Sequence, residues 1–101
     1  MQVVWANSAL DELDDIRAYY DTETGSRQAG ARVSKAIIDA ANKLALFPWQ
    51  GHIGEDGSRE WLVRKYPQYL LIYDVHKEPD LIEIISVYHQ SRGDRPSIHG
   101  L

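Results

Sequence analysis

Two long segments of this chain carry apolar residues at the spacing of one helix face, and a single glycine lies between them. The first segment repeats them every three or four residues, at Leu10, Leu13, Ile16 and Tyr20. The second keeps the pattern for longer, at Ala29, Val33, Ala36, Ile37, Ala40, Leu44 and Phe47. We expect Asn7 or Ser8 to cap the first helix and Ser26 the second, with Gly25 and Pro48 ending them. The pattern predicts a helical hairpin.

After residue 48 the sequence changes to residues typical of turns and then of strands. Three segments rich in β-branched and aromatic residues follow the turns, at 59–65, 69–75 and 81–88. The connections 66–68 and 77–80 are short enough only for antiparallel neighbours. With residues 2–5 as a short first strand, the order is β-α-α-β-β-β. We therefore predict an α+β fold in which the helical hairpin packs on a mostly antiparallel sheet.

The segment 69–75 is apolar on both faces of the predicted sheet. One face carries Tyr69, Leu71, Tyr73 and Val75, and the other carries Leu70 and Ile72. A sheet that is covered on one side only normally alternates apolar and polar residues. The helical hairpin can cover one face, so something else must cover the other. Two explanations stay open: the C-terminal tail or sheet curvature covers Leu70 and Ile72, or a protein partner docks there.

Length and charge limit the classes of protein to which the chain can belong. Its 101 residues fit a single domain, 1–101, whose glycines and prolines from about residue 91 predict a loose tail. No apolar stretch approaches the ~20 residues that span a bilayer, and the first residues lack a charged leader. We therefore expect a cytoplasmic protein with no membrane partner. The net charge of −4 also disfavours direct binding of nucleic acid.

Motifs for cofactors and metals are absent from the sequence. There is no Cys, and the four histidines form no HxH or HxxxH pair. No carboxylate cluster stands beside them at ligand spacing. The chain has neither GxxxxGK nor GxGxxG, and no serine lies in a nucleophile-elbow context. We expect no metal site and no cofactor.

Polar side chains gather on and after the predicted strands, at Arg59, Arg64, Lys65, Tyr88, His89, Arg92 and Arg95. A metal-independent nuclease could use such a set, with arginine stabilising the phosphate and histidine or tyrosine moving the 2′-hydroxyl proton. Cations at strand ends are also often merely solvated. His89 stands out because an apolar strand meets a polar tail there. It can be a partner contact, a capping group or a base, and the sequence leaves the three open.

A set of short motifs runs through the chain in a fixed order. They are Trp5 with Ala9-Leu10-x-x-Leu13-x-x-Ile16-x-x-Tyr19, Leu44-x-x-Phe47-Pro48-x-x-Gly51, Gly57-x-Arg59-Glu60, Tyr69-x-x-x-Tyr73, and Ile84-x-x-Val87-Tyr88-His89-Gln90-Ser91-Arg92. This ordered set resembles the RelE/ParE toxin superfamily. The resemblance implies a type II toxin held inactive by a small cognate antitoxin, as a homodimer or a toxin–antitoxin heterotetramer. An antitoxin wrapped over the toxin would cover Leu70 and Ile72, which are the expected antitoxin contacts.

The superfamily has two main activities, and the resemblance favours one of them. RelE-like members cleave messenger RNA on the ribosome with cationic side chains, and two of their arginine positions correspond here to Leu70 and Gln90. Their C-terminal tyrosine has no counterpart near Pro96. ParE-like members inhibit DNA gyrase, and their last strand commonly ends in a Leu-His or Phe-His pair, to which Tyr88-His89 is similar. We therefore expect a ParE-like gyrase inhibitor that acts by protein–protein binding.

The expected target contacts in that case are Arg59, Arg64, Tyr88, His89 and Arg92. Two alternatives stay open. In a RelE-like ribosome-dependent endoribonuclease, Arg59 and His89 would be catalytic. A non-toxic module of the same fold would only bind an antitoxin.

Overall fold

The computed structural model describes residues 1–93 and 98–99 and confirms the predicted α+β class and the order of the long elements. They are β1 (Gln2–Trp5), α1 (Asn7–Thr24), α2 (Arg27–Leu44), β2 (His52–Ile53), β3 (Arg59–Leu62), β4 (Tyr69–Lys77), β5 (Asp80–His89) and the 3₁₀ turn η1 (Gln90–Arg92). The short strand β2 lies in a segment expected to contain only turns. β3 is shorter than predicted, whereas β4 and β5 are longer. Neither α1 nor α2 is long and apolar enough to cross a membrane.

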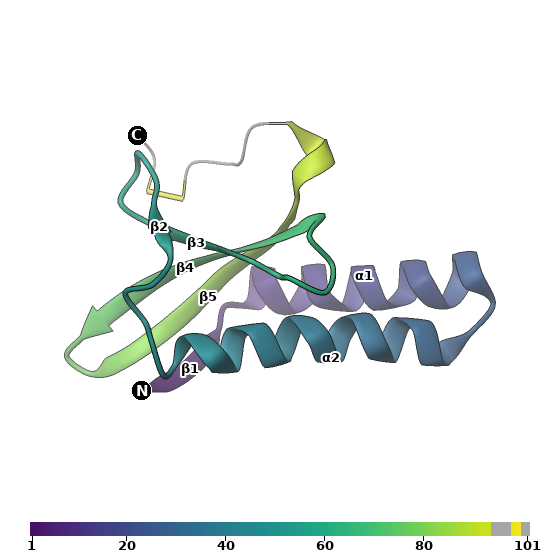
Figure 1. The fold of residues 1–101 in the computed structure, drawn as a ribbon, viewed down its shortest axis with the longest axis horizontal. Coiled ribbons are helices and arrows are strands. Elements are labelled where there is room, and N and C mark those ends of the chain that lie inside the picture. The colour runs from purple at the N-terminus through teal and green to yellow at the C-terminus, as the bar shows by residue number, and fades with distance from the viewer. Residues whose placement is uncertain (94–97, 100–101) are drawn as a thin grey trace.

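The strands form one five-stranded sheet in the order β1-β5-β4-β3-β2 (Figure 1). β2, β3, β4 and β5 pair antiparallel along the chain, and β1 runs parallel to β5. A parallel pair needs a long crossover, which the helical hairpin supplies. The mostly antiparallel sheet is therefore confirmed, and its one parallel pair follows from the position of the hairpin between β1 and the other strands.

The helical hairpin covers one face of the sheet and forms the core with it. Gly25 ends α1 with a φ of 66°, a left-handed conformation that favours glycine and turns the chain back into α2. The core joins the two helices to Val63 and to the inner residues of β4 and β5: Ala9, Leu13, Val33, Ile37, Ala41, Leu44, Val63, Tyr69, Leu71, Tyr73, Ile82, Ile84 and Val87. Burying large apolar side chains at about 1.5–3 kcal/mol each is the main stabilising term of such a core.

The helix ends differ from the predictions at three places. The residue that caps α1 is Ala6, because Ser8 Oγ instead donates to the carbonyl of Ile85 at 2.9 Å, across the edge of β5. Ser26 does precede α2, but its side chain makes no capping bond. α2 ends at Leu44, and Phe47, expected on its buried face, is 64% exposed.

One buried position of α1 was also predicted wrongly. Leu10 was expected on the apolar stripe and is 42% exposed, whereas Ala9 is fully buried in the core. The smaller side chain allows α1 to lie close to the sheet.

The face of the sheet opposite the helices, here called the far face, is covered in part by the chain itself. Ile72 is fully buried there, while Leu70 is partly exposed. The backbone N–H of Ile98 donates to Asp56 Oδ2 at 2.7 Å, and His99 Nε2 lies 3.1 Å from Asp74 Oδ1 on β4. Ile72 thus needs no partner to remove it from water. The rest of the predicted tail, 94–97 and 100–101, lies outside the described residues.

Candidate functional site

Two depressions on the surface involve residues singled out from the sequence. The first, here called the α1–β5 cleft, lies between α1 and the end of β5 and has a volume of about 360 Å³. Its lining residues are Glu12, Asp15, Ile16, Tyr19, Tyr20, Tyr69, Val87, His89, Ser91 and Arg92. The cleft forms because β1 pairs with β5 only from Leu81 to Ile84, so that α1 faces the edge of the second half of β5.

His89 lies in this cleft in a fixed orientation. Its ring meets the Tyr69 ring edge-on, with centroids 5.2 Å apart. Its Nδ1 accepts a hydrogen bond of 3.1 Å from the backbone N–H of Ser91 and caps η1. Because a backbone N–H can only donate, Nδ1 is the unprotonated nitrogen, and in the neutral ring Nε2 carries the proton. The imidazole therefore offers a donor to the cleft rather than a base.

Two acidic groups in the cleft hold their protons more tightly than usual. Burial raises the pKa of Glu12, partly opposed by hydrogen bonds from Ser86 Oγ, at 3.1 Å, and from the backbone N–H of Val87. Arg92 is close enough to oppose it slightly as well. Burial, followed by a hydrogen bond with the Tyr20 phenol, raises the pKa of Tyr69 well above its ordinary value. Tyr69 therefore stays a neutral phenol at physiological pH.

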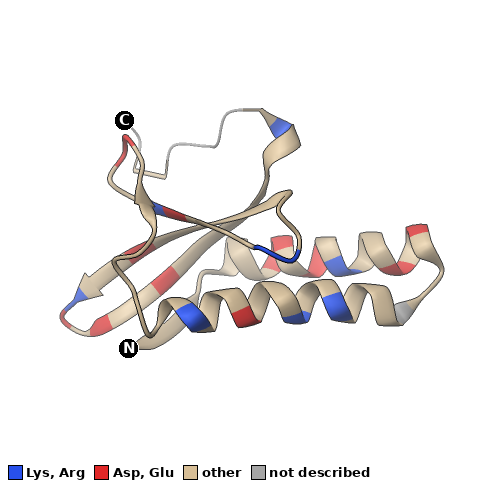
Figure 2. Cartoon of the chain, in the orientation of Figure 1, with Lys and Arg blue, Asp and Glu red and all other residues tan. Residues whose placement is uncertain are grey.

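The α1–β5 cleft carries few positive charges. Among its lining residues Arg92 is the single arginine or lysine, and it faces the carboxyl groups of Glu12 and Asp15. Figure 2 shows mostly acidic charged residues along α1 and mostly basic ones along α2. Gln90, at one family arginine position, donates through Nε2 to the carbonyl of Pro67 at 2.7 Å. The cleft thus offers mixed polar and aromatic groups of the kind found in protein interfaces.

The other predicted contact residues lie elsewhere. Arg59 Nη1 donates to the carbonyls of Trp49 and Gly51 at 3.0 and 2.8 Å, so its guanidinium holds the loop after α2. Arg64 is exposed and lies over the Trp61 ring, 5.9 Å from its centroid. Tyr88 is buried, and its hydroxyl donates to the Gly93 carbonyl. The structure thus brings only His89 and Arg92 of the five into one site, and their role as target contacts stays a prediction.

The second depression, here called the α2–β3 groove, was not found from the sequence. It has a volume of about 750 Å³, and its lining residues are Ala36, Asp39, Ala40, Asn42, Lys43, Leu44, Leu46, Phe47, Gln50, Trp61, Leu62, Val63, Arg64 and Lys65. Leu46, Phe47 and Leu62 are 72, 64 and 40% exposed. Apolar side chains exposed together in this way usually mark an interaction site. The run Leu44 to Trp49, apolar yet followed by turns, was the signal in the sequence.

No group of three metal-ligating side chains occurs at ligand distances in either depression, as far as the described residues go. One such group, Asp74, His76 and Glu83, does lie within the described part of the chain, on the far face. The sequence predicted no metal site, because Glu83 joins Asp74 and His76 only through the register of β4 and β5.

Comparison with known proteins agrees with the fold and gives the family. The family model for the ParE toxin of the type II toxin–antitoxin system parDE matches residues 3–93. A putative toxin, Y4kP, of Sinorhizobium fredii (strain NBRC 101917 / NGR234) is 28% identical over 89 residues, covering 88% of this chain and 91% of that protein.

Two solved structures share the fold at low sequence identity. One, from the chromosomal ParDE system of P. aeruginosa, has a TM-score of 0.76 at 18% identity and covers 88% of this chain and 95% of its own. The other, a YoeB/ParE toxin from Agrobacterium tumefaciens, has a TM-score of 0.61 at 16% identity and covers 89% and 99%. The match of the family model to nearly the whole chain shows that this protein belongs to the ParE toxin family of type II toxin–antitoxin systems.

Proposed function

We propose that this protein arrests growth by binding DNA gyrase and that a cognate antitoxin neutralises it by direct binding. The observation that carries the proposal is the state of His89. Its Nδ1 accepts the Ser91 N–H, so the neutral ring has no nitrogen left to take a proton from a ribose hydroxyl. The cleft around it also has two carboxyl groups and a single arginine. These features favour a cleft that binds a protein surface over one that cleaves RNA.

The α1–β5 cleft is the surface that we assign to the target. His89 offers an Nε2–H donor, Arg92 offers an exposed guanidinium, and Tyr19, 58% exposed, offers an aromatic face. Arginine and tyrosine are the residue types that most often dominate protein interfaces. The three lie together in the lining of one cleft. They would form a compact contact centre, with the carboxyl groups of Glu12 and Asp15 at its side.

The α2–β3 groove is the surface that we assign to the antitoxin. Most of its lining residues are apolar, and among the charged ones Lys43, Arg64 and Lys65 outnumber the single carboxylate of Asp39. This local positive charge stands out on a protein whose net charge is −4. The complementary occupant is an amphipathic segment with apolar side chains on one face and carboxylates on the other.

Induction of the protein alone in bacterial cells, followed by two readouts, tests the proposal. A gyrase inhibitor causes filamentation and DNA-damage signalling, and primer extension on translated messages finds no new 5′ ends. New cleavage ends on those messages, without DNA damage, would instead establish ribosome-dependent RNA cleavage. Unimpaired growth with abundant folded protein would mean that toxicity is absent and only antitoxin binding remains.

A further inference from the structure

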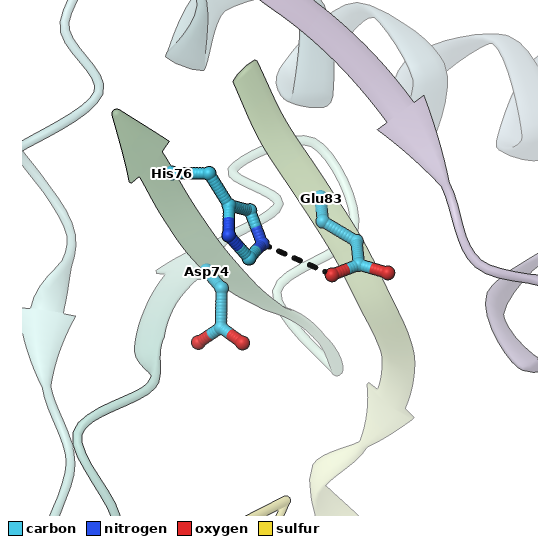
Figure 3. A group of neighbouring side chains, drawn as sticks. All are labelled: Asp74, His76 and Glu83. Atoms are coloured by element: carbon cyan, nitrogen blue, oxygen red, sulfur yellow. Dashed lines mark hydrogen bonds and ion pairs between the residues drawn. The ribbon is translucent and has the colours of Figure 1, made fainter. Parts of the chain in front are cut away.

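Three side chains that could ligate a metal ion meet on the far face of the sheet. Asp74 and His76 lie two residues apart on β4 and therefore point to the same face, and Glu83 on β5 pairs directly with Asp74. One ligand atom from each lies within 4.8 Å of the other two. Figure 3 shows the three side chains together, with His76 Nε2 3.1 Å from Glu83 Oε1.

Two carboxylates lie side by side in this cluster, and each contacts a histidine: Glu83 contacts His76 and Asp74 contacts His99. Asp74 and Glu83 are like charges at directly opposite positions of two antiparallel strands, an arrangement that destabilises a sheet. Lys77, the next residue in the chain, lies instead over the Trp49 ring, 5.8 Å from its centroid. The negative charge of two neighbouring carboxylates is one that a divalent ion can balance.

We propose that Asp74, His76 and Glu83 bind a divalent transition-metal ion, with Zn²⁺ as the representative member. The ligand set of one imidazole nitrogen and two carboxylate oxygens suits Zn²⁺, which in open sites takes three protein ligands and keeps a position for water. Atoms bound to one Zn²⁺ in tetrahedral geometry lie about 3.3 Å apart, so the present spacing closes with small side-chain rotations. The His76 and Glu83 side chains are 45 and 38% exposed, which gives the ion a path from solvent.

His99 supports the site from outside the set of ligands. Its Nε2 lies 3.1 Å from Asp74 Oδ1, while the Asp74 side chain is only 16% exposed. This contact holds one oxygen of the Asp74 carboxylate and leaves the other available to a metal ion. Metal binding would in this way also hold the segment around His99 against the sheet.

Zinc titration of the untagged protein by isothermal calorimetry tests the proposal, with the Co²⁺ visible spectrum as a second probe. The wild type should bind one Zn²⁺, and His76→Ala and Glu83→Gln should each weaken binding by at least about tenfold. The matched control His52→Ala removes an exposed histidine from β2, which β3 separates from the two strands of the cluster, and should bind like the wild type. We expect the variants to fold, because these side chains are at least partly exposed. Circular dichroism without metal checks that each of them does.

The outcomes separate a built site from chance binding. Zinc should also raise the melting temperature of the wild type and of His52→Ala, but not that of His76→Ala. The proposal would be overturned if His76→Ala and Glu83→Gln bound Zn²⁺ as tightly as the wild type. Loss of Zn²⁺ binding in His52→Ala would overturn it as well. His99→Ala should weaken binding without abolishing it, and an unchanged affinity would refute the supporting role of His99.

Discussion

The backbone N–H of Gly51, in the loop after α2, donates a hydrogen bond of 2.9 Å to the hydroxyl of Tyr73, in the middle of β4. The same hydroxyl donates to the carbonyl of Pro48, also at 2.9 Å. Arg59 donates to two more carbonyls of this loop. A Cβ on Gly51 would meet the Tyr73 hydroxyl and would lie 2.8 Å from the Glu60 carbonyl oxygen, so only glycine fits here. The sheet thus fixes the loop that carries Phe47 to the α2–β3 groove.

Tyr73→Phe should lower the free energy of unfolding by about 1–3 kcal/mol, because it leaves the buried polar groups of Pro48 and Gly51 without their partner. Urea unfolding followed by circular dichroism measures the change. Tyr19→Phe, at a tyrosine that is 58% exposed, is the matched control and should change stability little. Equal stability of the two variants would show that the hydroxyl does not hold the loop.

Glu12→Gln should become more stable relative to the wild type as pH rises from acid to neutral. The pKa of Glu12 is raised above 4.5 in the folded protein, so the folded state binds this proton more tightly than the unfolded chain. Stability that depends on the proton is therefore present at low pH and lost as pH rises through the folded pKa. The glutamine does not titrate and keeps an acceptor for Ser86.

Urea unfolding at a series of pH values measures this difference. Asp11→Asn removes a carboxylate from an exposed position of α1 and controls for a general effect of net charge. The free energies of unfolding of Glu12→Gln and the wild type could also differ by the same amount at every pH. That result would contradict a pKa of Glu12 raised by burial.

Phe47→Glu should leave toxicity intact and prevent neutralisation by the antitoxin. Loss of a central apolar contact at an interface costs about 2 kcal/mol or more, roughly 30-fold in affinity, and the added charge repels an acidic partner. Co-expression with the antitoxin and calorimetry of the purified pair are the measurements. Ile53→Glu, at an apolar residue that is 53% exposed and lies outside the groove, should be neutralised normally. Failure of both variants to be neutralised would move the antitoxin site elsewhere.

Arg92→Glu and Arg64→Glu should have opposite effects on toxicity and on antitoxin binding. Arg92 lines the α1–β5 cleft, so its reversal should reduce toxicity and preserve antitoxin binding. Arg64 lies in the α2–β3 groove, so its reversal should weaken antitoxin binding by roughly tenfold and preserve toxicity. Growth after induction and affinity for the antitoxin give the two readouts. The same pattern in both variants would mean that the two partners share one surface.

The order of the elements could be predicted from periodicity, because each helix and strand buries a face at a regular spacing. The end of α2 could not, since Tyr73 and Arg59 hold the Pro48–Gly51 loop from a distant part of the chain. The prediction that Asn7 or Ser8 caps α1 was wrong for a similar reason. Ser8 finds its partner in Ile85, 77 residues away.

The candidate sites were predictable only where they depend on neighbouring residues. His89 and Ser91 are two positions apart, and a capping bond at this strand end was one of the roles left open for His89. Asp74, His76 and Glu83 come together through the register of β4 and β5, which contains a bulge near Ile72 and Tyr73. One residue of slippage would move Glu83 to the other face, so no sequence spacing alone could indicate this cluster.

Supercoiling of relaxed plasmid by purified DNA gyrase, in the presence of increasing amounts of this protein, tests the central claim most directly. We predict that supercoiling falls as the protein is added, that Arg92→Glu restores it, and that the antitoxin restores it with the wild-type protein. The contradicting result is full supercoiling at a large excess of this protein, although the same protein halts growth when it is induced in cells. Gyrase would then not be the target.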